Sequence, residues 1–114
     1  MGDVTAHFSR SEFVCRHCGE YRGDLEHLCE HLERLRAAVG RPCVIVSGYR
    51  CPAHNRAVGG ASQSRHLYGD AVDLEHGYAT EAQAAAAGFT GVGRYSGYAT
   101  HVDLRPGGPA RWDY

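Results

Sequence analysis

Lysine is absent from the sequence, and all twelve basic residues are arginine. Thirteen acidic residues bring the formal net charge to −1. Without an excess of positive charge the chain cannot hold a phosphate backbone by charge alone, so we expect no nucleic-acid partner. The planar guanidinium of arginine suits carboxylate recognition better than the point charge of lysine, so this bias permits a carboxylate ligand without identifying one.

Long apolar runs are missing as well. No stretch approaches the roughly 18 apolar residues of a membrane-spanning helix, so we expect no membrane insertion. The opening sequence MGDVTAHFSR lacks the apolar core, about seven or more residues long, that follows the basic start of a secretory signal. We therefore expect no signal peptide and synthesis in the cytoplasm.

Internal repeats, low-complexity runs and Pro/Ser-rich linkers are also lacking. With 114 residues, 43% apolar and 22% charged, the chain has the size and composition of one globular domain spanning residues 1–114. No patterned apolar face is left over beyond the needs of the core, so we expect a monomer.

Cysteines are too few for a disulfide scaffold, and an odd number cannot all pair within one chain. We expect mostly reduced thiols, and a disulfide between some of them is the alternative. The five cysteines are Cys15, Cys18, Cys29, Cys43 and Cys51.

The clearest helical signal covers residues 24–39, where apolar residues recur at three- and four-residue spacing. Asp24 suits the N-cap position and Gly40 the position after the last turn. The apolar positions are Leu25, Leu28, Leu32, Leu35 and Val39. The charged and histidine residues between them are typical of a solvated helix face.

Two strands are predicted in the middle of the chain. Residues 43–47 form a β-branched run that indicates a buried strand. Residues 71–75 alternate between apolar and acidic side chains, so Asp73 and Glu75 lie on one face of a second strand.

The second half of the chain adds a helix and a hairpin. Residues 80–83 have the spacing of a capping box and open an alanine-rich helix. Residues 91–95 and 98–104 are further strand candidates, and the large Trp112 indicates that the tail folds back. The order of elements predicts an α+β fold in which a small antiparallel sheet is flanked by helices.

Three potential metal ligands are placed to converge on that sheet. His66 ends a loop, Asp73 lies on the following strand, and His101 lies on a strand that can pair beside it. Two imidazoles and one carboxylate are typical of a catalytic zinc site, because three protein ligands leave the fourth position open to water. By spacing alone this pattern is weak, since eight histidines produce such pairs by chance.

The surrounding motifs resemble the zinc D-Ala-D-Ala carboxypeptidase family. They are Val46-Ser47-Gly48-Tyr49-Arg50-Cys51-Pro52, Ser64-x-His66-x-x-Gly69-x-Ala71-x-Asp73 and His101-Val102-Asp103. The resemblance runs from about Phe8 to Trp112 and is strongest to short single-domain peptidases of bacteria and their phages. That branch is similar to murein endopeptidases as well as to carboxypeptidases.

The resemblance implies a D-Ala-D-Ala peptidase-like (hedgehog-like) fold with a Zn²⁺ cofactor. It implies that His66, Asp73 and His101 bind zinc and that Ser64 orients a ligand side chain. It further implies that Arg50 holds substrate and helps to stabilise the oxyanion, a role that needs a fixed cation near the developing negative charge. The alternative for Arg50 is an ordinary salt bridge.

The sequence departs from the family where many relatives carry the catalytic acid. That position is Tyr98, which together with Tyr95 is a candidate donor of a hydrogen bond to the oxyanion. Asp103 shares a strand face with His101 and is our candidate general base. Its alternatives are a carboxylate that orients a ligand, or a structural pair with an arginine such as Arg105. Glu75 is another candidate base.

A second metal site can begin at Cys15-x-x-Cys18. The close Cys or His pair that would complete a common zinc motif is missing at finger spacing, although histidines flank Cys29. A disulfide and free thiols are the other interpretations of these cysteines.

The resemblance implies a zinc peptidase that hydrolyses an amide bond in the stem peptides or cross-bridges of peptidoglycan. It leaves carboxypeptidase and endopeptidase action both open. The competing hypothesis is a non-catalytic peptidoglycan-binding or zinc-dependent assembly module on the same fold, supported by the missing acid. Because the substrate lies outside the membrane, we expect access by phage-type release, dedicated delivery or removal of a leader.

Overall fold

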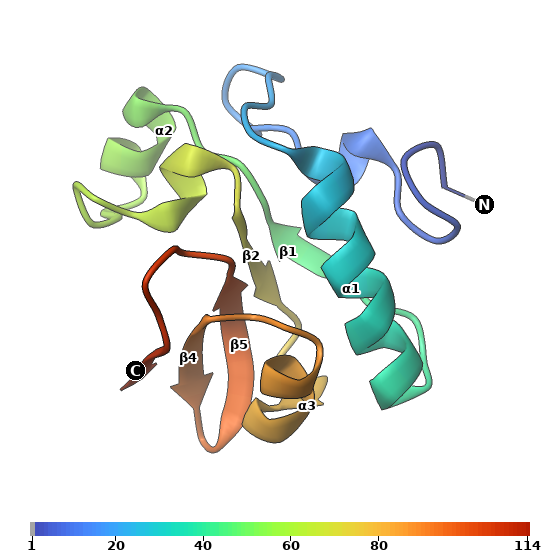
Figure 1. Cartoon of the computed structure of the whole chain (residues 1–114). Helices are drawn as coiled ribbons and strands as arrows, with labels where there is room; N and C mark the ends of the chain where they lie inside the picture. Colours follow the sequence, from blue (N-terminus) through green and yellow to red (C-terminus); the bar gives the residue numbers. More distant parts are fainter. Residues whose placement is uncertain (1) are drawn as a thin grey trace.

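The computed structural model describes residues 2–114 and combines short helices with one mixed sheet (Figure 1). Its helices are η1 (Arg10–Glu12), α1 (Leu25–Val39), α2 (Pro52–Ala57), η2 (Arg65–Tyr68) and α3 (Glu81–Ala86), of which η1 and η2 are 3₁₀ turns. Its strands are β1 (Ile45–Ser47), β2 (Ala71–Leu74), β3 (Ala79–Thr80), β4 (Gly91–Tyr95), β5 (Tyr98–Asp103) and β6 (Ala110–Asp113). The α+β prediction is confirmed.

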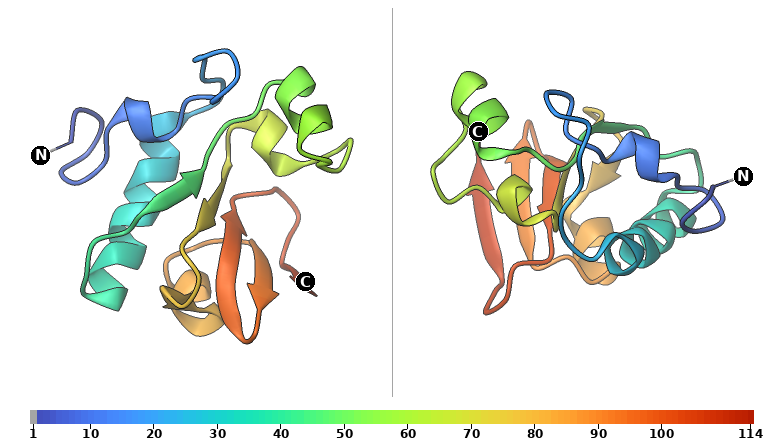
Figure 2. Two further views of the ribbon diagram at one scale, coloured as in Figure 1. Left: turned by 180° about the vertical axis from the view of Figure 1, so that it is seen from behind. Right: turned by 90° about the horizontal axis from the view of Figure 1, so that it is seen from above.

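The sheet has the strand order β1-β2-β5-β4-β6, and β3 pairs with β5 beside this path. Every pairing is antiparallel except that of β4 with β6, which is parallel. The tail therefore folds back, as the sequence predicts, and adds a strand that local pattern does not reveal. Figure 2 shows the same sheet from behind and from above.

Helix α1 forms as its apolar spacing predicts. The Asp24 side chain accepts a hydrogen bond from the His27 N–H, and Gly40 ends the helix at φ +83°. A left-handed φ is easily adopted by glycine, which lacks a Cβ. Leucines 25, 28, 32 and 35 are buried and pack in one core with residues of α3 and the sheet (Figure 1).

Strand β1 differs from the prediction of a fully buried strand. Ile45 is buried, but Val44 and Val46 are 52% and 49% exposed. The cause is the position of β1 at the edge of the sheet, where it pairs with β2 on one side. A β-branched run does not distinguish an edge strand from a central one.

The later elements match their local signals. Thr80 and Gln83 exchange side chain to backbone hydrogen bonds in the predicted capping box of α3. A tight turn with φ +50° at Ser96 and +83° at Gly97 joins β4 to β5. Across residues 2–114 no helix combines the length and apolar character needed to cross a membrane.

Candidate metal centre

The pairing of β2 with β5 brings two of the predicted ligands together. Asp73 lies opposite His101 in this register, and Val72 lies opposite Val102. Because successive side chains of a strand alternate between faces, the two valines enter the core while Asp73 and His101 lie on the other face. Both valines are fully buried in the hydrophobic core.

The third ligand reaches the same place from η2. The Ser64 hydroxyl accepts a hydrogen bond from the His66 N–H at 3.3 Å, and Gly69 closes the turn at φ +73°. His66 Nδ1 lies 2.7 Å from the carbonyl oxygen of Gly48, so this nitrogen carries the proton and donates it. His66 Nε2 is thereby left with a lone pair that faces Asp73.

The donor atoms of the three residues converge. Asp73 Oδ1 lies 3.2 Å from His66 Nε2 and 3.1 Å from His101 Nδ1, and the three donor atoms all lie within 4.8 Å of one another. Both imidazoles are buried, whereas the side chain of Asp73 is 28% exposed. The histidine side of the cluster is thus covered by protein, and its carboxylate side is partly open.

Counting protons tests whether these residues fit a metal ion. The four ring nitrogens of His66 and His101 all face oxygen acceptors. Two neutral imidazoles supply only two N–H groups, and the outer contacts to Gly48 and Asp103 use both. The two inner nitrogens then direct lone pairs at the Asp73 carboxylate, an arrangement that a cation between the three atoms satisfies. The donor set fits a metal ion.

Without a metal ion, protonated histidines can instead donate hydrogen bonds to Asp73, and these bonds set the ionisation of the cluster. Burial raises the pKa of Asp73, but hydrogen bonds from His101 and His66 outweigh it and hold the pKa well below its ordinary value. Burial lowers the pKa of His101, but hydrogen bonds to Asp103 and Asp73 outweigh it and raise the pKa. A carboxylate kept ionised beside nitrogens that attract positive charge is an electrostatic site for a cation.

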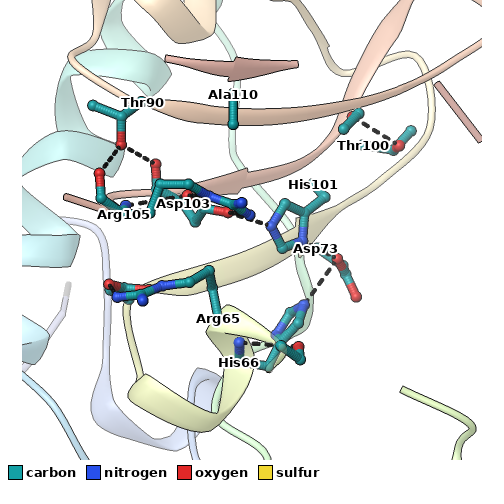
Figure 3. A network of polar contacts seen from close by, with 12 residues as sticks. Arg65, His66, Asp73, Thr90, Thr100, His101, Asp103, Arg105 and Ala110 are labelled. Atoms are coloured by element: carbon teal, nitrogen blue, oxygen red, sulfur yellow. Dashed lines mark hydrogen bonds and ion pairs between the residues drawn. The ribbon is translucent and has the colours of Figure 1, made fainter. Parts of the chain in front are cut away.

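Asp103 lies on the opposite side of the His101 ring from Asp73 (Figure 3). It is completely buried. Its Oδ2 accepts from His101 Nε2 at 2.8 Å and from Arg105 Nη2 at 2.7 Å, while Oδ1 accepts from the backbone and Nε of Arg105. Both oxygens are engaged and buried, so the general-base prediction has no structural support. The alternatives, an orienting carboxylate and an arginine pair, are both present.

Arg50 lies in front of the cluster. Its Nη2 is 3.1 Å from Asp73 Oδ2, and its Nη1 is 3.3 Å from Oδ1 of the buried Asn55. Gly60 approaches so closely that a Cβ there would lie 2.1 Å from the same Asn55 oxygen. The guanidinium is therefore a fixed cation beside the candidate metal site.

The cluster opens into a cleft of about 670 Å³. Its walls include Arg50, Ser64, Thr100 and the tail residues Trp112 and Tyr114. The indole of Trp112 lies 5.2 Å from the His101 ring. Strand β6 thus forms one wall of the cleft.

Comparison with known proteins assigns the family. A sequence model of the family described as peptidase M15 matches residues 6–103. The chain belongs to the peptidase M15 family. It is also 40% identical over 89 residues to a zinc D-Ala-D-Ala carboxypeptidase of Streptomyces albus G, a match that covers 71% of this chain. The matched region spans 34% of that carboxypeptidase, so the chain corresponds to about a third of its length.

The resemblance read from the motifs is therefore confirmed as membership of the M15 family. The expected zinc cofactor agrees with three findings: the family, the zinc named in the relative's description, and the convergence of the predicted ligands. The fold expected for an M15 peptidase agrees with the helices and small sheet described above.

Two predicted site residues lie elsewhere in this M15 domain. Tyr98 pairs with Thr80 at the opposite end of β5 from Asp103, and its exposed ring lies against His76. Glu75 follows the last residue of β2 and is exposed. Neither lines the cleft, so the predicted hydrogen bond from Tyr98 to an oxyanion has no structural support.

Arg105, expected as a possible arginine partner of Asp103, clamps its carboxylate and also lies over the Trp112 ring at 4.8 Å. Two other groups that shape the site were not predicted from the sequence. They are the Gly48 carbonyl, because a backbone oxygen has no sequence signature, and Asn55, which acts through a loop contact.

Proposed function

We propose that this chain is a zinc peptidase that hydrolyses an amide bond in the stem peptides or cross-bridges of peptidoglycan. The observation that carries the proposal is the convergence of His66, Asp73 and His101 with Arg50 at the mouth of a cleft. The name of the carboxypeptidase relative supports a substrate with a D-alanyl peptide bond. The proposal covers both carboxypeptidase and endopeptidase action.

The ligand set favours zinc over magnesium and calcium. Two imidazoles and a carboxylate are common catalytic zinc ligands, whereas magnesium and calcium prefer all-oxygen sites. When bound, zinc lowers the pKa of a water molecule and polarises a carbonyl group. His66, Asp73 and His101 would hold it, with the exposed side of the cluster facing the cleft.

Residues behind the ligands fix their orientation. The Gly48 carbonyl holds the proton of His66 on Nδ1, and Asp103 holds the proton of His101 on Nε2. Such hydrogen bonds set the tautomer and make the opposite ring nitrogen a better ligand. We assign Asp103 this positioning role in place of proton transfer.

Arg50 would act on the substrate. Its guanidinium is held by Asp73 and Asn55 beside the cluster, where negative charge develops on the carbonyl oxygen during attack. A cation already in place stabilises that charge without reorganisation. It also suits the carboxylate of a peptide terminus.

One observation favours the second candidate function, a peptidoglycan-binding or zinc-dependent assembly module without turnover. Among the residues described here, Asp73 supplies the only carboxylate that lines the cleft. Amide hydrolysis needs a group that takes a proton and returns it to the leaving amine. A domain that kept the ligands and lost this acid would bind the peptide without cleaving it.

The deciding experiment measures metal content and peptidoglycan digestion together, for wild type, His66→Ala and the exposed control His76→Ala. The peptidase proposal predicts stem-peptide fragments in the mass spectrum for wild type and the control. In His66→Ala these fragments should be lost together with one equivalent of zinc. Binding without fragments would establish the module instead. Equal zinc content in all three proteins would overturn the assignment of the site.

The remaining features of the proposal concern the whole protein. We propose that residues 1–114 act as a single monomeric domain at the cell wall, reached by phage-type release, dedicated delivery or loss of a leader. Sedimentation of the purified chain tests the monomer, and fractionation of producing cells tests the location.

A further inference from the structure

Three cysteines outside the histidine cluster meet where the loop after η1 reaches the start of α2. Cys15 and Cys18 lie on the loop after η1, and Cys51 directly precedes α2. Their three sulfur atoms all lie within 4.8 Å of one another. Cys51 is the partner that the Cys15-x-x-Cys18 motif lacked in sequence, because a fold contact rather than a short spacing brings it there.

A tight turn closes the loop around Cys15. The Gly19 N–H donates to the Cys15 carbonyl at 2.8 Å, and Gly19 has φ +75°. The N–H groups of His17 and Cys51 each lie 3.4 Å from Cys15 Sγ. Backbone donors around a sulfur stabilise its thiolate, the form that binds metal.

The other two cysteines behave differently. Cys29 and Cys43 are buried in the hydrophobic core. Burial raises the pKa of Cys29 to about 12 and that of Cys43 to about 11. Such thiols remain protonated and act as small apolar side chains. All five cysteines are free in the structure, yet only three are grouped.

The sequence points to His54 as the fourth ligand, because Cys51-x-x-His54 repeats the spacing of Cys15-x-x-Cys18. The structure groups the three sulfurs alone, and it brings the backbone N–H of His54, at the start of α2, to 3.4 Å from Cys51 Sγ. The partly buried His54 ring stacks on the exposed ring of His17 at 6.2 Å, so a turn of the His54 side chain toward the sulfurs completes the set.

We propose that Cys15, Cys18, Cys51 and His54 bind a second, structural zinc ion. Three thiolates and one imidazole form a closed tetrahedral set of the kind that holds zinc for folding rather than for catalysis. Soft thiolate ligands select zinc over the hard cations that carboxylates bind. Three sulfurs cannot all pair in disulfides within one chain, whereas one ion satisfies all three.

The consequence of this site is a tie between two loops. It would link the loop after η1 to the segment that carries Arg50, the residue immediately before Cys51 (Figure 2). Arg50 contacts Asp73 in the cleft. The second ion would therefore fix the backbone of Arg50 through its neighbour Cys51, and it would take no part in the reaction.

Cobalt substitution tests the site without relying on activity. The full chain, stripped of metal and titrated with Co²⁺, should bind two equivalents and show the intense near-ultraviolet absorption of thiolate-bound cobalt. The absorption should be lost together with one equivalent in Cys18→Ser, whose exposed position leaves the buried core unchanged. His66→Ala should also lose one equivalent but keep the absorption, which separates this proposal from that of the catalytic site.

Matched controls assign the ligands. Cys43→Ala should keep both equivalents. His54→Ala should weaken cobalt retention at the cysteine site by about 100-fold or more, since even loss of a ligand's hydrogen-bond partner costs about 10–100-fold. His17→Ala should leave retention unchanged, and the reverse result would overturn the choice of His54. A wild-type chain without thiolate absorption, or with a mass lowered by an internal disulfide among Cys15, Cys18 and Cys51, would overturn the site itself.

Discussion

Asp103 has two candidate roles, orienting His101 or acting as a general base, and the two roles predict different results for one substitution. Replacing it with Asn keeps the shape but removes the charge that His101 and Arg105 share. We expect zinc affinity at the histidine site to fall by about 10–100-fold, as for other losses of a ligand's hydrogen-bond partner. Competition with a chromogenic chelator measures this loss.

The exposed Asp113→Asn, which disturbs only a pair with Arg94, is the control for that measurement and should bind zinc like wild type. If Asp103 were a general base instead, Asp103→Asn would abolish hydrolysis and leave zinc affinity intact. The two roles therefore move different quantities, and the affinity measurement distinguishes them even if the chain has no turnover.

Arg50 is tested by the conservative change to Lys. A lysine keeps one positive charge but cannot contact Asn55 and Asp73 at once as the guanidinium does. We expect kcat/KM on a D-alanyl peptide to fall by about 100-fold, the usual loss for one group that stabilises an oxyanion. Zinc content should remain that of wild type.

Arg56→Lys, on the exposed surface of α2, controls for the loss of an arginine nearby and should leave kcat/KM unchanged. Equal activity of Arg50→Lys and wild type would remove Arg50 from the reaction and leave it a salt-bridge residue.

At the scale of elements, η2 depends on Gly69. This glycine has φ +73°, and a Cβ on it would lie 1.5 Å from the carbonyl oxygen of Arg22. We expect Gly69→Ala to lower the free energy of unfolding by about 2–4 kcal/mol, from the left-handed backbone and the steric overlap together. Urea unfolding followed by circular dichroism measures it.

Gly77 separates the two contributions to that loss. It has a similar φ of +80°, but nothing lies within 4 Å of an added Cβ. Gly77→Ala should therefore cost only the left-handed term, about 1–2 kcal/mol. Equal losses for the two variants would show that the contact with Arg22 is relieved by a small backbone shift.

The N-terminal segment is attached to α1 through Glu33. Its carboxylate accepts hydrogen bonds from the Thr5 hydroxyl and the His7 N–H and contacts His7 Nδ1. Burial raises the pKa of Glu33, but the hydrogen bonds from His7 and Thr5 outweigh it, so the folded pKa lies below the ordinary value of 4.5. A carboxyl group whose folded pKa is lowered stabilises the fold at pH values above its unfolded pKa. This stabilisation is lost as the pH falls through the folded pKa.

Glu33→Gln should therefore cost about 1 kcal/mol at neutral pH, the net value of such hydrogen bonds. Its difference from wild type should shrink as the pH falls below the ordinary range of a glutamate. Urea midpoints measured across that range check the sign. A difference that does not change with pH would mean that the contact is one of shape alone.

Elements with a strong local signal were predictable from sequence, and contacts between elements were not. The leucine spacing of α1 and the capping box of α3 each lie within the helix that they predict, so a short stretch of sequence is enough to recognise them. Strand alternation placed Asp103 on the same face as His101, but it does not say whether the Asp103 carboxylate faces the cleft or the interior. Gly91 on the neighbouring strand leaves room for that carboxylate in the interior, because a Cβ at Gly91 would lie 2.1 Å from Asp103 Oδ1.

The cysteine cluster shows the same limit at longer range. Cys15 and Cys18 carry a recognisable spacing, but their partner Cys51 is supplied by the way the loop after η1 folds against the start of α2. The grouping of His66, Asp73 and His101 was predictable, because the motifs around them are long enough to indicate a family, and the structure brings their donor atoms together.

For the whole molecule, the two proposed metal sites lie on either side of Arg50. The histidine site joins η2 to the centre of the sheet, and the cysteine site joins the N-terminal loop to α2. A chain of this length buries a modest core, and bound metal adds directly to the stability of such small domains. Removing metal should therefore loosen two separate regions rather than one.

Thermal unfolding with and without zinc tests this arrangement. A ligand at 100 times its Kd stabilises the fold by about 2.7 kcal/mol per site, which corresponds to a shift on the order of 10 °C in the Tm of a domain this small. We expect a strong chelator to lower the Tm of wild type by roughly twice the amount seen in His66→Ala or Cys18→Ser, because each variant has already lost one site. A chelator effect in Cys18→Ser as large as in wild type would mean that all of the stabilisation comes from the histidine site.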